Sequence, residues 1–198
     1  MTKAALICLA ATLAIAVPSA AHEHGGAKAE AEAPVMIGPK VGDAAPSLEG
    51  TVAVMADGAE ATTGENGRVL VFVRSADWCP FCKTQLNELE DITGSLAEAG
   101  WTIEAISYDS PEILAGFANE NDLSFTLRSD EGSEAIRAFG LLNTDVREGA
   151  RSYGIPHPAV VFVSSAGTVS AVLREEGYRT RPSVDAIMET AEALGQLG

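Results

Sequence analysis

The segment Val69-Leu70-Val71-Phe72-Val73 is followed closely by Trp78-Cys79-Pro80-Phe81-Cys82, and then by a regularly spaced set of apolar residues. A short apolar run of this kind predicts a buried strand. Spacings of three and four residues, as on one face of a helix, separate Cys82, Leu86, Leu89, Thr93 and Leu96. The stretch therefore predicts a strand, a sharp corner that carries two cysteines, and a helix.

The corner places its two cysteines in different environments. Cys79 is expected at the N-cap of the helix and Pro80 at its first position, where a missing N–H has no cost. The free N–H groups of the first turn and the helix dipole then favour the thiolate form of Cys79, which is the nucleophile. Cys82 lies one turn further on and is expected to be more enclosed, placed to close a disulfide with Cys79.

The first 21 residues have the organisation of a signal peptide. Lys3 gives a basic start, 4–17 is almost wholly apolar, and Pro18-Ser19-Ala20-Ala21 offers the small residues of a cleavage site. A membrane anchor needs about 20 apolar residues, and this run is shorter. We expect cleavage after Ala21 and export, to the bacterial periplasm, with no membrane insertion of the mature chain.

Removal of this segment would leave only two cysteines. Cys8 lies within the apolar run, so Cys79 and Cys82 become the only thiols of the mature chain. In exported proteins thiols usually end as stable disulfides between distant residues. A lone C-x-x-C pair is instead typical of a catalytic dithiol.

Residues 22–40 are rich in Ala, Glu and Gly and are predicted to form a flexible acidic tether. If the mature chain begins with His22-Glu23-His24, its amine and histidine nitrogens suit Cu(II) or Ni(II), although a plain polar tail is the simpler interpretation. The whole chain has 13 basic and 28 acidic residues, a net charge of −15. This charge argues against nucleic acid and anionic lipid as partners.

Residues 41–198 are predicted to form one α/β domain. We expect strands at 51–54, 69–73, 101–108, 125–127, 160–163 and 168–174, and helices at 80–99, 111–119, 134–139 and 183–194. Strands alternate with helices and the chain ends in a hairpin followed by a helix, which predicts three layers around a partly parallel sheet.

A second notable segment, Gly154-Ile155-Pro156-His157-Pro158, leads into a predicted buried strand. Pro158 fits the first position of that strand, and a cis bond there would leave backbone free to pair with an extended substrate. His157 is the only histidine outside the tether. Three roles are open to it: none, tuning the Cys79 thiolate, or completing a metal site.

Several segments, in order, resemble known proteins. Ala76–Cys82 resembles the active-site segment of the thioredoxin superfamily. Three further segments resemble its AhpC/TSA branch, the redoxin or peroxiredoxin-like proteins, namely Val41–Pro46, Phe125–Asp130 and Ala138–Gly140. The resemblance implies a thioredoxin-like fold, a central mixed sheet flanked by helices, with Pro158 as the cis-proline rather than Pro156.

This chain departs from the peroxiredoxin pattern at several positions. Phe72 replaces a proline, Ala76 replaces a threonine, and the His157-Pro158 step replaces an arginine, for which Arg74 or Arg128 could substitute. Fewer donors would then stabilise a reacting peroxide. Val73 also replaces the buried aspartate of thioredoxins, so the base for Cys82 is not identified.

These observations favour an exported thiol-disulfide oxidoreductase in which Cys79 attacks and Cys82 resolves. The expected supporting residues are Trp78, Pro80, Phe81, His157 and Pro158. One alternative is a thiol-dependent peroxidase with Cys79 as the peroxidatic cysteine; another is a copper chaperone that uses Cys79, Cys82 and His157. No cofactor is expected. The expected partner is a protein with a disulfide or thiol, or an electron-donating reductase, and the direction of electron flow stays open.

Overall fold

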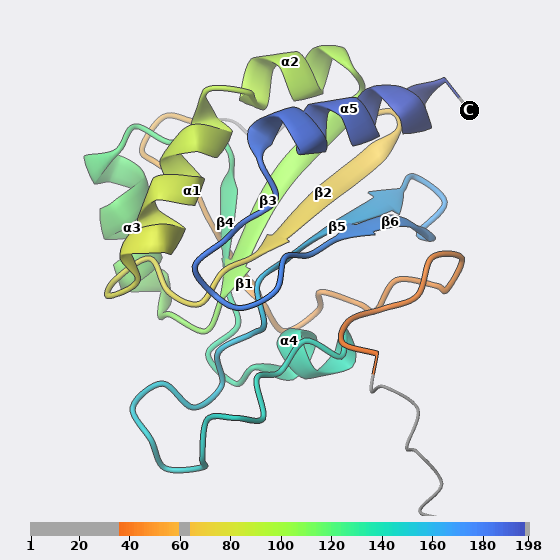
Figure 1. Cartoon of the computed structure of the whole chain (residues 1–198). Coiled ribbons are helices and arrows are strands. Elements are labelled where there is room, and N and C mark those ends of the chain that lie inside the picture. Colours follow the sequence, from red (N-terminus) through yellow and green to blue (C-terminus); the bar gives the residue numbers. More distant parts are fainter. Residues whose placement is uncertain (1–35, 60–63, 197–198) are drawn as a thin grey trace, which may run out of the picture. The chain divides into compact units, whose positions relative to one another are not determined.

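The computed structural model describes residues 36–59 and 64–196. In this part of the chain six strands form one sheet in the order β1-β4-β3-β2-β5-β6 (Figure 1). The strands are β1 (Val52–Val54), β2 (Gly67–Phe72), β3 (Trp101–Ser107), β4 (Thr126–Ser129), β5 (Ala159–Ser164) and β6 (Val169–Leu173). Strands β2, β3 and β4 run parallel, whereas β1, β5 and β6 each pair antiparallel with a neighbour. The predicted mixed sheet is confirmed.

The helices lie on both faces of this sheet. They are α1 (Pro80–Glu90), α2 (Thr93–Glu98), α3 (Pro111–Glu120), α4 (Glu134–Ala138) and α5 (Val184–Gly195). Helices α1, α2, α3 and α5 share one hydrophobic cluster with the sheet, and α4 belongs to the cluster on the opposite face (Figure 1). The predicted three-layer α/β arrangement is therefore confirmed.

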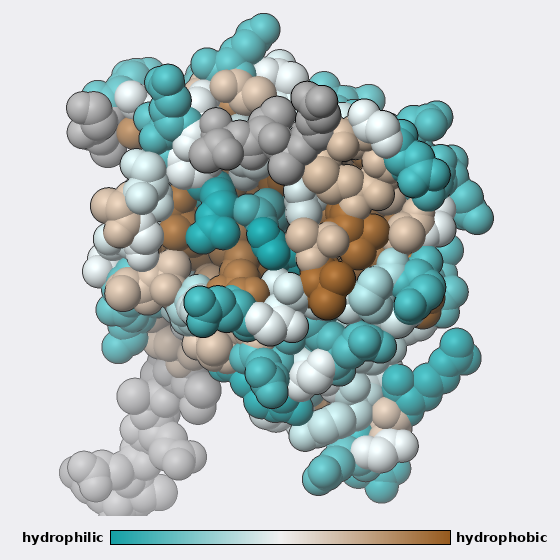
Figure 2. Space-filling model, turned by 180° about the vertical axis from the view of Figure 1, so that it is seen from behind, coloured by the Kyte–Doolittle hydropathy of each residue, from teal (hydrophilic) through white to brown (hydrophobic). Residues whose placement is uncertain are grey.

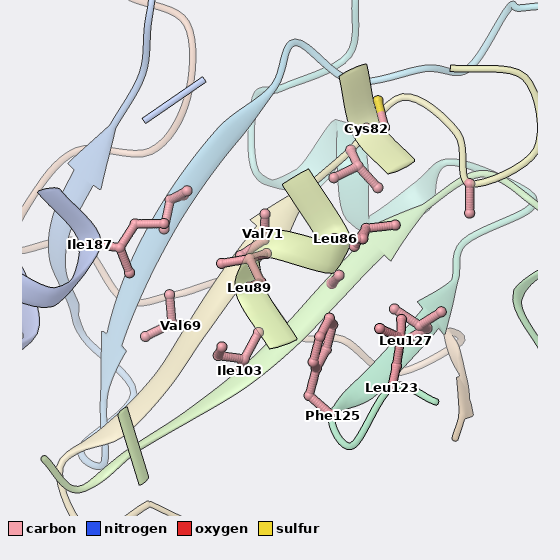
Figure 3. Close-up of a cluster of buried hydrophobic side chains, with 14 of the residues drawn as sticks. Val69, Val71, Cys82, Leu86, Leu89, Ile103, Leu123, Phe125, Leu127 and Ile187 are labelled. Atoms are coloured by element: carbon pink, nitrogen blue, oxygen red, sulfur yellow. The ribbon is translucent and has the colours of Figure 1, made fainter. Parts of the chain in front are cut away.

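Strand β2 supplies both cores because its side chains alternate between the two faces. Val69 and Val71 belong to the cluster under α1, whereas Leu70 and Phe72 belong to the cluster with α4. Figure 3 shows Cys82, Leu86 and Leu89 on the face of α1 that points toward the sheet. All three are fully buried, so the dithiol corner is attached to the central core.

The predicted helix at 80–99 is in fact two helices. The Ile92 N–H donates to the Leu89 carbonyl at 3.2 Å, and the Thr93 hydroxyl donates to the same carbonyl at 3.0 Å. These bonds compete with the regular ladder and break it between α1 and α2. Leu96 is nevertheless buried on α2, so the apolar spacing was preserved across the break.

The packed chain begins ahead of Val41. The Gly38 N–H donates to the Gly140 carbonyl at 3.0 Å, and Ile37 packs against the α4 cluster. The predicted signal peptide, His22 and the tether up to residue 35 lie outside the described residues. Within the described ranges, none of the helices is both long and apolar enough to cross a membrane.

The surface seen from behind is largely hydrophilic, with apolar residues in smaller areas between polar ones (Figure 2). Among the described residues, large apolar side chains with marked exposure are Met36, Val41, Val52, Phe81, Ile113 and Tyr178. Two of them, Phe81 and Tyr178, contact one another beside the dithiol, with ring centroids 6.1 Å apart.

Candidate redox site

Cys79 and Cys82 form a disulfide at the start of α1, with their Cα atoms 5.3 Å apart. Cys79 is the N-cap residue, in an extended conformation, and Pro80 lies in the first turn. The corner follows the carboxyl end of β2, which is flanked in the sheet by β3 and β5. Residues that follow β3 or precede β5 therefore approach the dithiol from either side.

The immediate surroundings of the two sulfurs differ from the sequence-based expectation. Cys79 and Cys82 are both buried, with 1% and 0% of their surface exposed. The N–H groups of Cys82 and Lys83 both donate to the Cys79 carbonyl at 3.1 Å, and no side-chain bond caps the helix. In this oxidised state the helix N–H groups are not directed at the Cys79 sulfur.

A guanidinium contacts the dithiol instead. Arg181, in the segment between β6 and α5, places Nη2 3.4 Å from the Cys82 sulfur. Its Nε donates to the Oε1 of Gln85 at 3.0 Å, and its Nη1 donates to the carbonyls of Tyr178 and Thr180. Burial, with a smaller effect of Arg74, lowers the pKa of Arg181 to about 10, so it remains charged at neutral pH.

Sequence reasoning missed Arg181 because 99 positions separate it from Cys82. Its partner Gln85 offered one local signal, a polar residue that is 4% exposed on the buried side of α1. A buried amide requires a partner. Arg181 therefore supplies positive charge that stabilises a Cys82 thiolate and reduces the need for the base that the sequence did not reveal.

We expect Arg181→Gln to make the dithiol harder to reduce. Loss of the guanidinium removes a charge that stabilises the Cys82 thiolate, and it lowers the reduction potential by about 30 mV, which is a factor of ten in the equilibrium constant. Equilibration with glutathione redox buffers measures the potential. Arg179→Gln, which removes the same charge from the same segment, is the matched control; equal shifts in both variants would contradict a specific role.

Trp78 is held by a short chain of hydrogen bonds. Its indole Nε1 donates to the Tyr108 hydroxyl at 2.9 Å, and that hydroxyl donates to the Arg151 carbonyl at 3.4 Å. Trp101, Phe117 and Phe139 are buried in the core. Tyr108 is partly buried against the α4 cluster, and its hydroxyl also positions Trp78.

Asp109 fixes the loop that precedes the dithiol. Its carboxylate accepts hydrogen bonds from the Ser75 hydroxyl at 2.8 Å, the Ala76 N–H at 2.6 Å and the Ser107 hydroxyl at 2.9 Å. Burial raises the pKa of this carboxyl, and the hydrogen bonds from Ala76, Ser75 and Ser107 oppose the rise. Sequence reasoning missed this role of Asp109, because Ser75 and Ala76 lie more than 30 positions away in the chain.

The His157-Pro158 step lies where the sequence places it, directly before β5. No cis peptide bond occurs in the described residues, so the predicted cis bond at Pro158 is wrong. The His157 N–H donates to the Leu141 carbonyl at 2.6 Å. The ring lines a cavity of about 400 Å³ that also includes Pro158, Arg174 and Tyr178.

His157 does not join the cysteines in a metal site. Within residues 36–59 and 64–196, no three His, Cys, Asp or Glu side chains gather as ligands. Burial and, to a smaller extent, Arg174 lower the pKa of His157. The lowered pKa favours the neutral form of His157, which is the form less suited to stabilising a thiolate.

Two arginines were candidates to replace the missing peroxiredoxin arginine, and the structure separates them. Arg128 pairs with the buried carboxylate of Glu104 within the sheet. Arg74 lies beside the dithiol motif, with its Cζ 5.1 Å from the Trp78 ring and 4.3 Å from the Tyr178 ring. Phe72 packs into the core, 4.9 Å from the Phe139 ring.

A dithiol at a strand-to-helix corner, on this sheet topology, defines a thiol-dependent redox protein of the thioredoxin-like class. Residues 41–172 match the model of the AhpC/TSA family. The chain belongs to that family.

Individual relatives agree with this assignment. The chain is 30% identical over 127 residues to the protein named Peroxiredoxin Bcp of Escherichia coli strain K12, covering 64% of this chain and 80% of that protein. A peroxiredoxin-like protein from Aquifex aeolicus superposes with a TM-score of 0.63 at 22% identity, over 81% of this chain and 90% of that one. AhpC of Mycobacterium bovis superposes with a TM-score of 0.65 at 21% identity, over 82% and 96%. The predicted thioredoxin-like fold is confirmed.

Proposed function

We propose that this thiol-dependent enzyme catalyses dithiol-disulfide exchange through Cys79 and Cys82. The observation that supports this best is that the two cysteines are bonded at the start of α1 with a guanidinium against the Cys82 sulfur. A nucleophile, a resolving cysteine and a charge that favours thiolate are the groups that exchange requires. Phe72 and Ala76 provide no donor for a peroxide oxygen.

In the proposed reaction the Cys79 thiolate attacks one sulfur of a substrate disulfide. The substrate S–S bond breaks, one substrate thiolate leaves and takes a proton from water, and Cys79 carries a mixed disulfide. The Cys82 thiolate then attacks the Cys79 sulfur and releases the second substrate thiol. Two electrons pass from the protein to the substrate, and the reverse sequence oxidises a dithiol.

Access is the step that requires motion. Because only 1% of Cys79 is exposed in the disulfide state, a substrate reaches the sulfur after the side chains around it move. Phe81 and Tyr178 contact one another at the solvent-exposed edge of the site. Pro158, at the start of β5, remains our candidate for docking an extended substrate, although its bond is trans.

Thiol-dependent peroxide reduction is the second candidate, favoured by the family and by the Bcp relative. The Cys79 thiolate would attack one peroxide oxygen, breaking the O–O bond and leaving a sulfenic acid and an alcohol or water. Attack by Cys82 would release water and give the same disulfide. In both schemes a thiol reductant, such as a dithiol protein, regenerates the pair.

Single-turnover oxidation separates the two candidates. Fully reduced protein is mixed with hydroxyethyl disulfide or with hydrogen peroxide, and formation of the Cys79–Cys82 disulfide is followed by quenched intact mass. We expect the second-order rate constant to be larger with hydroxyethyl disulfide than with hydrogen peroxide. A larger constant with peroxide would transfer the assignment to the peroxidase.

We further propose that the chain is exported to the bacterial periplasm after cleavage following Ala21. The apolar run at 4–17 and the small residues before His22 support this. N-terminal sequencing of protein recovered from the periplasm of an expressing bacterium should begin at His22. Cytoplasmic recovery with residues 1–21 retained would contradict the proposal.

A further inference from the structure

Arg74 is a partly buried cation that has no acidic partner among the described residues. Within the described ranges no carboxylate lies within 4.0 Å of its guanidinium, and its Nε is buried without a hydrogen-bond partner. Burial lowers the pKa of Arg74, which reflects the same loss of hydration. A guanidinium placed this way lacks the acceptors that such groups normally have.

Arg74 contacts two aromatic rings. Its Cζ lies over the Trp78 ring at 5.1 Å and over the Tyr178 ring at 4.3 Å. Rings stacked on a guanidinium cover its faces, whereas its N–H donors point outward in the plane. Neither contact is a hydrogen bond to the N–H donors of Arg74, which suit an acceptor with two oxygens.

Arg74 lines a cavity of about 300 Å³, here called the Arg74 pocket, together with Trp78, Arg151 and Ser152. Arg151 adds a second guanidinium, whose described ion pair is a loose one with Asp77 at 3.8 Å. Trp78 directly precedes Cys79 in the chain. The pocket thus combines two guanidinium groups and a hydroxyl next to the residue that adjoins the nucleophile.

This set of donors matches a carboxylate. Arginine binds carboxylates through paired N–H···O bonds, and neither Arg74 nor Arg151 can accept a hydrogen bond. The protein has a net charge of −15, so its long-range field repels anions. A preference for an anionic substrate would therefore have to come from a local site.

We propose that the Arg74 pocket binds a carboxylate of a small disulfide substrate and so holds its S–S bond at the Cys79–Cys82 pair. This inference rests on the proposed exchange function and specifies its substrate class. One arm of such a molecule fits the pocket, while the sulfur atoms lie toward the dithiol.

Three disulfides with the same two-methylene arm test the charge preference. They are 3,3′-dithiodipropionate, hydroxyethyl disulfide and cystamine, which end in carboxylate, hydroxyl and ammonium groups. For each disulfide, kcat/KM is divided by the rate constant of its uncatalysed reaction with dithiothreitol. We expect this normalised value to be at least about tenfold larger for the dicarboxylate than for cystamine. Arg74→Gln and Arg151→Gln should each reduce this ratio, mainly through KM for the dicarboxylate.

Arg147→Gln is the matched control because it removes the same charge from the loop that carries Arg151, at an exposed position outside the pocket. If Arg147→Gln loses the preference for the dicarboxylate as strongly as Arg74→Gln does, the preference results from long-range charge. That result would contradict the proposal that the Arg74 pocket binds the carboxylate. Equal normalised rates for all three disulfides in the wild type would also overturn it.

A binding measurement without chemistry separates the pocket from the exchange function. Suberate is the all-carbon analogue of 3,3′-dithiodipropionate, and calorimetric titration should show binding to the wild type and to Arg147→Gln, with at least about tenfold weaker binding to Arg74→Gln. If suberate binds this way but no disulfide is reduced, the exchange function fails and the carboxylate site stands. If suberate does not bind the wild type, or inorganic phosphate binds in its place, the carboxylate site is overturned.

Discussion

Cys79→Ser is expected to reduce disulfide exchange by at least about a thousandfold, because the variant lacks the thiolate that begins the reaction. The substitution is nearly isosteric at a buried position, so the fold should be retained. Turnover of hydroxyethyl disulfide with dithiothreitol as reductant measures the loss, and circular dichroism checks the fold.

Cys82→Ser is the matched variant, since it keeps the nucleophile and removes the resolving thiol. We expect it to complete the first attack at a rate within about tenfold of the wild type, allowing for lost electrostatic coupling to Arg181, and then to stop at a mixed disulfide. Normal turnover in Cys79→Ser together with inactivity in Cys82→Ser would reverse the roles assigned to the two cysteines.

Asp109→Ala should lower the free energy of unfolding by about 2–3 kcal/mol, because the buried Ala76 N–H and two serine hydroxyls lose their acceptor. The loop before the dithiol is held by these bonds, so activity should fall with stability. Urea unfolding measures the change. Glu88→Ala, which removes an exposed carboxylate on α1, is the control and should change stability by less than about 0.5 kcal/mol.

The same carboxyl gives a pH dependence of known sign. Burial raises the folded-state pKa of Asp109 above 3.8, so the folded protein binds this proton more tightly than the unfolded chain. Its contribution to stability therefore falls as pH rises from about 3.8 through the folded-state pKa. Asp109→Asn removes this term, and its stability relative to the wild type should rise across that window. A constant difference between the two would contradict the raised pKa.

The fold was largely predictable because its signals are local. The apolar run before the cysteines and the alternation of strands with helices depend on neighbouring residues, and both appear in the structure. The break between α1 and α2 was not predicted, because it results from competition between backbone and side-chain donors for the Leu89 carbonyl.

The site was predictable only in part, because its electrostatics come from distant segments. The sequence identifies Cys79, Cys82 and Pro80 at their corner, and the structure places them there. Arg181, Asp109 and Tyr108 reach the site only through the topology, which brings the ends of β2 and β3 and the segment after β6 together. For His157 the sequence left three roles open, and the structure shows its N–H bonded to the Leu141 carbonyl and its ring in a cavity with Pro158.

The central claim is that Cys79 attacks sulfur rather than oxygen, and the arrested variant tests this most directly. Reduced Cys82→Ser protein is exposed to equal concentrations of hydroxyethyl disulfide and hydrogen peroxide, quenched with acid at short times, and analysed by intact mass and peptide mapping. We predict that the first product is a mixed disulfide with mercaptoethanol on Cys79. A Cys79 sulfenic acid, a gain of one oxygen, formed ahead of the mixed disulfide would contradict the exchange function and assign the enzyme to peroxide reduction.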